Sequence, residues 1–406
     1  MVKLIIDFNE FMEKKYSSLA MGYTPSGFLH VGFLTTLACA FMYLKEHPNT
    51  RLIITNIENS LSNKLSKYQG VPLRFQYLEE RGLAIPKDVS QMHKRNSAAR
   101  AVQRELNDLI WKLVTSFDQK TTQEIKRLDR LAIPASHKDW LLQKENRLYH
   151  VFDSHIISLS FVHVLENSSN FRRLFMSTFL DPRFAEISSV LTGIDPKAKR
   201  IGNAVIKGEK RYEPFGFAVP IRLYCPNCYQ VSATWASIVT GHPTFGEPTL
   251  ATLCANKSCK RNISKIDDGF ILQKVISGPP ELMEVHFMAD PIRDFFEPFY
   301  ADCHIFGGDY FQLEYERSGM TAISKIEALF SYMEGKTNQQ KHIFCGPLIT
   351  MDGRKMSKSD TAFNIKDIPN VKKAFINIIE VLENYRAQKV PGPLQMDYRE
   401  IIRRAA

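Results

Sequence analysis

The chain has 406 residues, of which 44% are hydrophobic and 24% charged, as in folded proteins too long for one compact core. Its apolar stretches are shorter than the roughly 20 residues of a membrane-spanning helix, and acidic residues interrupt the apolar N-terminus, so the expected location is the cytoplasm. The formal charge of +10, from 53 basic and 43 acidic residues, suits an anionic partner or substrate, although many ordinary proteins are equally basic.

Residues 1–90 alternate short apolar runs with helical stretches, which predicts the first half of a doubly wound parallel sheet. Residues 17–23 are typical of a buried strand, and residues 33–47 of a helix that ends before Pro48. Between them lies the segment TPSGFLHVGF, residues 24–33. A turn of small residues from a strand into a helix leaves backbone N–H groups at the positive end of the helix dipole, where phosphate binds. The segment therefore predicts a phosphate-binding corner, and an ordinary strand–turn–helix corner is the alternative.

Residues 91–204 are predicted to form an inserted helical module. The stretches 97–117 and 150–169 carry the apolar spacing of helices.

Four of the seven cysteines predict a structural zinc site in a zinc ribbon over residues 205–275. They form two short-spaced pairs, CPNC and CANKSC. Each pair can present two thiolates to one ion, and two pairs complete a closed tetrahedral site that has no open position for catalysis. The predicted ligands are Cys225, Cys228, Cys254 and Cys259. Cys39 and Cys345 lie in apolar runs and are predicted to be core residues.

Residues 276–350 return to strand-like runs, such as 283–288 and 341–351, and are predicted to complete the sheet. Residues 351–406 begin with a loop that contains KMSKS, in which Lys355 and Lys358 can both approach one polyphosphate. A flexible basic loop is the alternative. The rest of this segment is predicted to form a short tail of one or two amphipathic helices around a Pro-Gly-Pro turn.

Taken together, these motifs resemble those of the class I aminoacyl-tRNA synthetases. HVGF at residues 30–33 is similar to the His-Ile-Gly-His signature of that class, and KMSKS at 355–359 matches its second signature. HIFGGDY at 304–310 is similar to the Gly-Gly-Asp stretch near the adenosine. Within the class, the Pro-Ser-Gly lead-in, the zinc-ribbon insert and the run FFEPFYADCHIFGG resemble the class I lysyl-tRNA synthetases. The resemblance implies a Rossmann-type, HUP-like fold.

The resemblance also implies an activity, in which an amino-acid carboxylate attacks the α-phosphorus of ATP to give an aminoacyl adenylate and pyrophosphate. The catalytic residues would be His30, Lys355 and Lys358, with Mg²⁺ on the phosphates. The full ATP-binding set implied is Ser26, Gly27, His30, Gly32, Gly307, Gly308, Asp309, Lys355, Ser357 and Lys358.

The sequence departs from the family in the signature and in the amino-acid pocket. Phe33 stands where the signature has His or Asn, so one polar donor to the phosphates is missing. Acidic runs of the family are altered here, with Asn56 and Glu58 where aspartates are usual. Lysine or an analogue is the favoured amino acid. The candidate pocket residues are Tyr23, Thr24, Glu58, Glu284 and His286, although Glu284 and His286 can equally form an ordinary half-exposed strand pair.

The short tail after KMSKS stands where the relatives carry a helical anticodon-binding domain, so we expect a truncated synthetase that does not read anticodons. Its acceptor would be the tRNA acceptor end or another amine or hydroxyl. Two alternatives stay open. One is a non-catalytic synthetase paralogue that binds RNA or a protein partner. The other is a different nucleotidylyl transfer on the same fold.

Overall fold

The computed structural model describes the parts of the chain that form its main sheet, its helices and two smaller sheets. The described residues are 5–23, 31–56, 92–124, 146–160, 215–218, 237–239, 249–253, 270–274, 301–307, 340–345, 348–349, 365, 368–389 and 396–397.

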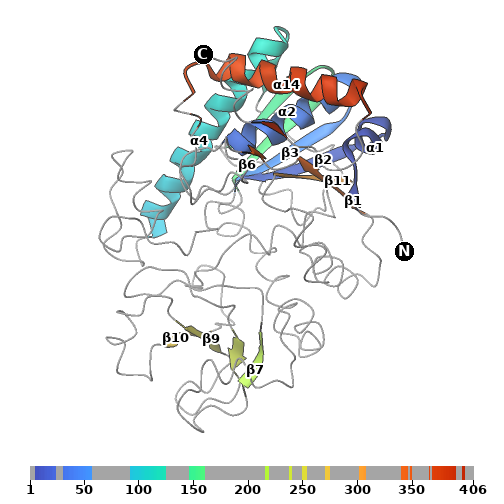
Figure 1. Ribbon diagram of the computed structural model, residues 1–406. Helices are drawn as coiled ribbons and strands as arrows, with labels where there is room; N and C mark the ends of the chain where they lie inside the picture. The colour runs from blue at the N-terminus through green and yellow to red at the C-terminus, as the bar shows by residue number, and fades with distance from the viewer. Residues whose placement is uncertain are drawn as a thin grey trace.

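The fold is α/β, with a mostly parallel eight-stranded sheet and helices packed against it (Figure 1). In spatial order its strands are β1 (Ile5–Ile6), β12 (Lys341–Cys345), β11 (Cys303–Gly307), β2 (Ser18–Tyr23), β3 (Arg51–Asn56), β6 (Ser154–Ser160), β5 (Arg147–Val151) and β4 (Thr122–Glu124). The first six strands in this order, from β1 at one edge to β6, run parallel to one another. At the other edge, β5 pairs antiparallel with β6, and β4 pairs antiparallel with β5.

The described helices are α1 (Phe8–Glu13), α2 (Val31–Glu46), α4 (Met92–Phe117) and α14 (Val371–Ala387). Two smaller sheets are separate from the main one. The first is antiparallel and contains β7 (Phe215–Ala218), β8 (Ser237–Val239), β9 (Thr249–Leu253) and β10 (Phe270–Lys274). The second pairs β13 (Leu348–Ile349) with β14 (Met396–Asp397).

The helix α2 is the centre of the core, because it lies between the sheet and α14 (Figure 1). Every side chain from Phe33 to Leu44 is buried, which explains why this helix is apolar all round. An aromatic cluster joins α2 to the elements that cover it. Phe41 of α2 packs edge to face against Phe117, Phe152 and Phe375, with ring centroids 5.4–5.8 Å apart. These contacts join α2 to α4, to the β5–β6 turn and to α14.

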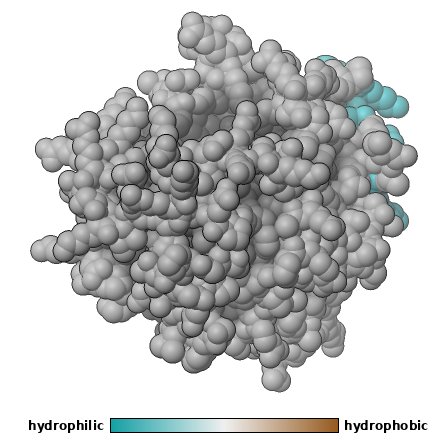
Figure 2. Space-filling model, turned by 90° about the horizontal axis from the view of Figure 1, so that it is seen from below, coloured by the Kyte–Doolittle hydropathy of each residue, from teal (hydrophilic) through white to brown (hydrophobic). Residues whose placement is uncertain are grey.

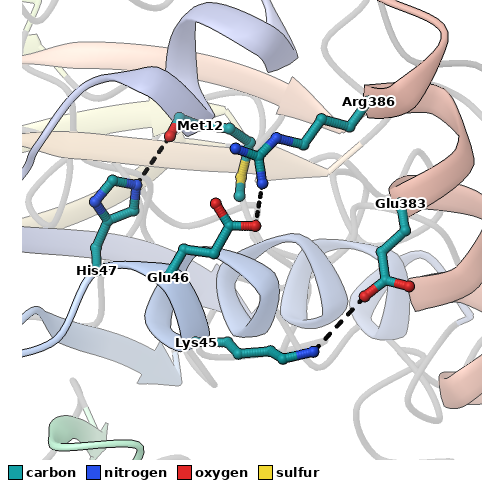
Figure 3. A network of polar contacts seen from close by, with 6 residues as sticks. All are labelled: Met12, Lys45, Glu46, His47, Glu383 and Arg386. Atoms are coloured by element: carbon teal, nitrogen blue, oxygen red, sulfur yellow. Dashed lines mark hydrogen bonds and ion pairs between the residues drawn. The ribbon is translucent and has the colours of Figure 1, made fainter.

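Polar contacts fix the carboxyl end of α2 (Figure 3). His47 Nε2 lies 2.9 Å from the carbonyl oxygen of Met12 in α1. Glu46 pairs with Arg386, and Lys45 Nζ lies 3.8 Å from Glu383 Oε1, both partners being in α14. These ion pairs are largely exposed, so they orient α14 more than they stabilise it.

The structure confirms the strand predicted at 17–23, the helix at 33–47 and the helix at 97–117, which form β2, α2 and α4. The helix predicted in the tail is α14, and Cys39 and Cys345 are core residues with no exposed surface. The α/β class is also confirmed.

The helix predicted within residues 150–169 is wrong for residues 150–160, which form the hairpin of β5 and β6. The two turn residues, Phe152 and Asp153, have φ values of 49° and 61°, the left-handed geometry of a tight two-residue hairpin. Asp118 Oδ2 accepts a hydrogen bond from the Phe152 N–H at 3.0 Å, and Asp153 O accepts one from Asn49 N–H at 3.0 Å. β6 then pairs with β3, so this stretch belongs to the main sheet and not to a helical module.

At the amino ends of the strands, one carboxylate joins β2 to β11. Asp302 Oδ2 accepts hydrogen bonds from Ser17 N–H, Ser17 O–H and Ser18 N–H at 2.9, 2.6 and 3.0 Å. The Asp302 N–H donates in turn to Ser18 O at 2.9 Å, and Asp302 O accepts from Lys341 N–H at 2.8 Å. Three adjacent strands, β2, β11 and β12, are thus held together at one end. We call this set of bonds the Asp302 clamp.

We expect Asp302→Ala to lower the free energy of unfolding by about 1–2 kcal/mol, because two backbone N–H groups lose a charged acceptor at a partly exposed position. Urea unfolding followed by circular dichroism measures this loss. Glu380→Ala, which removes an exposed carboxylate from α14, is the control and should change the value by less than about 0.5 kcal/mol. Equal effects of the two variants would contradict the role given to the clamp.

Candidate functional site

The order of the parallel strands reverses between β2 and β11. From β2 the chain proceeds outward to β3 and then β6, whereas β11 and β12 lie on the opposite side of β2. In open α/β sheets, ligands bind at such a switch point, outside the carboxyl ends of the strands. The candidate site is therefore the edge of the sheet where Tyr23 ends β2 and Gly307 ends β11.

The ladder between the two central strands is short. The register of β2 with β11 contains two Cα pairs, Cys303 with Leu19 and His304 with Ala20. By comparison, β2 pairs with β3 over six residues, and β11 pairs with β12 over five. The two pairs lie next to the Asp302 clamp, at the amino ends of β2 and β11.

The described part of the β2–α2 corner is Tyr23 on one side and Val31 onward on the other. Gly32 lies in the first turn of α2, and its carbonyl oxygen accepts hydrogen bonds from the hydroxyls of Thr35 at 2.8 Å and Thr36 at 2.9 Å. These bonds fix the amino end of the helix, where the macrodipole is positive. Phe33 is buried against Tyr23, with ring centroids 5.4 Å apart. Thr24, Ser26, Gly27 and His30 lie outside the described residues.

The second strand at the switch point, β11, ends at Gly307, and Gly308 and Asp309 lie outside the described residues. The neighbouring strand β12 ends at Cys345 and is followed by β13. Lys355, Ser357 and Lys358 are also outside the described residues. The chain is described again at two buried isoleucines, Ile365 and Ile368, which precede α14. In sequence, the segment that carries KMSKS follows β13, which pairs with β14 outside the main sheet, and precedes these isoleucines and α14.

Of the remaining residues predicted near the amino-acid pocket, the structure describes only Asn56. Asn56 ends β3 and pairs in register with Tyr23. Glu58, Glu284 and His286 lie outside the described residues, so the acidic partner for a lysine side chain stays a prediction.

The four predicted zinc ligands also lie outside the described residues, but the strands beside them bear on the prediction. The antiparallel order β7–β8–β9–β10 puts Ala218 beside Ser237 and Leu253 beside Phe270. The segment with Cys225 and Cys228 joins the first two of these residues, and the segment with Cys254 and Cys259 joins the other two. Both segments thus start and end at the same end of this sheet, as a four-cysteine site requires. Within the described part of the chain no cluster of potential metal ligands occurs.

Sequence reasoning missed two histidines on the face of the sheet opposite α2. His342 of β12 and His304 of β11 are register partners, and their rings lie 6.3 Å apart. His342 is fully buried, its ring nitrogens have no hydrogen-bond partner, and Phe306 stacks beside it. Burial, together with the nearby His304 and Lys341, holds the pKa of His342 well below its usual value. The position of His342 inside the apolar run KHIFC was the one sequence indication that it is buried.

The described surface adds little to the candidate site. Large exposed hydrophobic side chains among the described residues are Trp111 in α4 and Ile376 in α14. In the view from below, the described side chains are hydrophilic and gather at the margin on the side of α1 (Figure 2). Within the described segments, no helix has the length and apolar character needed to cross a membrane.

No protein-family model matches the sequence, and none of the curated proteins is significantly similar to it.

We expect stability to fall in mild acid because of His342. Its pKa is lower in the folded than in the unfolded chain, so below about pH 6.5 the unfolded state binds the extra proton. The free energy of unfolding should then decrease by up to about 1.4 kcal/mol per pH unit until the folded-state pKa is reached. His342→Leu should flatten this pH dependence between pH 7.5 and 5.5 in urea titrations. Ile305→Val, at a buried position of the neighbouring strand β11 that does not titrate, should keep the wild-type slope. Equal slopes in all three proteins would refute the assignment.

Proposed function

We propose that the chain is an ATP-dependent ligase that activates an amino acid as an aminoacyl adenylate, as class I lysyl-tRNA synthetases do. The observation that carries the proposal is the strand order. The segment with HVGF follows β2, HIFGGDY begins within β11, and KMSKS comes after β12 with the short strand β13 between them. The strands β2, β11 and β12 are adjacent in the sheet, with their carboxyl ends at one edge.

The proposal includes a doubly wound, Rossmann-type fold of the HUP kind. The outward order β2, β3, β6 on one side and β11, β12 on the other is the order expected for that fold. Side chains on the sheet face opposite α2, such as Ala20, Ile53 and Ile157, are buried as well. Burial on both faces is typical of parallel sheets covered by two layers.

The proposed reaction needs positioning and charge stabilisation more than covalent chemistry. An amino-acid carboxylate oxygen forms a bond to the α-phosphorus of ATP, the α–β phosphoanhydride bond breaks, and pyrophosphate leaves with the electron pair. His30 and the backbone at the start of α2 would bind the phosphates. Lys355 and Lys358 would stabilise the negative charge that develops on the leaving group. Mg²⁺ would supply further neutralisation of the phosphates, and no described residue is assigned to it.

The acceptor of the activated amino acid is proposed to be the acceptor end of tRNA or another amine or hydroxyl. The net charge of +10 is compatible with RNA but does not select it. Lysine or an analogue remains the favoured amino acid.

Amino-acid-dependent exchange of pyrophosphate into ATP tests the proposed function directly, with each of the twenty amino acids and with or without total tRNA. We expect exchange with one amino acid. Lys355→Ala and Lys358→Ala should each slow exchange at least a hundredfold, with amino-acid binding nearly unchanged, because their contacts strengthen as the leaving group gains charge. Lys373→Ala, at an exposed position of α14, is the control. Folded protein without exchange under any condition would refute the proposal and favour a non-catalytic role.

Zinc content tests the four-cysteine site independently of activity. We expect one zinc ion per chain by atomic emission, and less than half of that in Cys225→Ser or Cys254→Ser, because a three-thiolate site binds zinc more weakly. Cys39→Ala removes a buried core thiol and should retain the full zinc content. Clearly less than one ion per wild-type chain would contradict the zinc ribbon.

A further inference from the structure

Phe33 departs from the signature that the segment 30–33 resembles, and its surroundings give the departure a physical meaning. It is the third residue of α2, and its ring packs edge to face on the ring of Tyr23, at 5.4 Å and an interplanar angle of 61°. The two residues are 7% and 6% exposed and belong to the core cluster under α2. An edge-to-face pair of this kind is a favourable and directional contact between aromatic rings.

The pair lies where β2 ends and α2 begins. Tyr23 ends β2 and is the register partner of Asn56 at the end of β3. Phe33 lies in the first turn of α2, and helix ends unwind easily unless side-chain contacts hold them. The ring contact therefore joins the end of β2 to the first turn of α2.

A polar side chain at position 33 would meet the Tyr23 ring and the core, not an open polar cleft. Burial of an imidazole there would require a hydrogen-bond partner, whereas Phe33 meets the Tyr23 ring edge to face within the hydrophobic core cluster. This surrounding argues against the idea that Phe33 is merely a lost phosphate ligand.

We propose that Phe33, through its contact with Tyr23, is a positioning residue that fixes the first turn of α2 at the nucleotide-binding edge of the sheet. The inference rests on the proposed function for the identity of the ligand, ATP. Under the proposed function, backbone N–H groups in the first turn of α2 bind the phosphates, and the aromatic pair holds those groups in place. Restoring His at position 33 is then harmful instead of helpful.

Two variants and one control test the inference. Phe33→Leu removes the ring, and Phe33→His installs the residue of the related signature. The control is Phe117→Leu, which also removes a ring that packs on α2, through Phe41. Positions 33 and 41 are separated by roughly 12 Å along the helix. The measurements are the ATP dissociation constant at pH 8 by calorimetry, and hydrogen exchange of the amides of residues 34–37, whose helical partners are the carbonyls of residues 30–33.

We expect both Phe33 variants to weaken ATP binding five- to twentyfold and to speed exchange of these amides at least tenfold. Phe117→Leu should lower the melting temperature comparably and change neither quantity. Tighter ATP binding by Phe33→His would overturn the inference in favour of a lost ligand. Wild-type exchange at residues 34–37 in Phe33→Leu would overturn it as well.

Failure of the proposed function gives a different pattern. Wild-type protein that binds no ATP would refute the proposed function. The amide exchange requires no nucleotide and would still decide whether the aromatic pair fixes the first turn.

Discussion

The Asp302 carboxylate is the constraint on which the geometry of the candidate site depends. Its hydrogen bonds to Ser17 and Ser18 join β2 to β11 at their amino ends, where the register between these strands is continuous. Each of the two strands is paired along its length with its outer neighbour, β2 with β3 and β11 with β12. The clamp therefore joins the two halves of the sheet at the switch point.

The helix α2 also connects the two halves of the sheet. It packs against the strands on both sides of the switch point, and α14 covers its outer face. Tyr43, near its carboxyl end, donates a hydrogen bond to Lys14 O at 2.7 Å and accepts one from Tyr16 N–H at 2.6 Å. Burial raises the pKa of this phenol to about 12, so it stays protonated and able to donate. The carboxyl end of the helix is thus fixed by polar contacts, and its amino end by Gly32 and the Tyr23–Phe33 contact.

The sequence allowed the main elements near the site to be predicted, because their patterns are strong. The apolar run at β2 and the long helical stretch of α2 are unambiguous, and the small residues between them indicate a corner. The β5–β6 hairpin was missed because its turn, Phe152-Asp153, lacks the glycine or asparagine that usually marks such turns, and its apolar residues also fit a helical spacing. The clamp could not be predicted, because Ser17 and Asp302 are far apart in the chain and small polar residues before a strand are common. The short ladder between β2 and β11 is likewise a property of the register, which no local pattern specifies.

The return of the chain to α14 has a consequence for any ligand at the switch-point edge. Cys345 at the end of β12 and Ile365 before α14 are both buried in the core cluster under α2. The chain on either side of residues 350–364 is therefore anchored in one core. Under the proposed function, Lys355 and Lys358 are then tethered to the same core as the ATP site, and such tethering raises the effective concentration of a group at a neighbouring site.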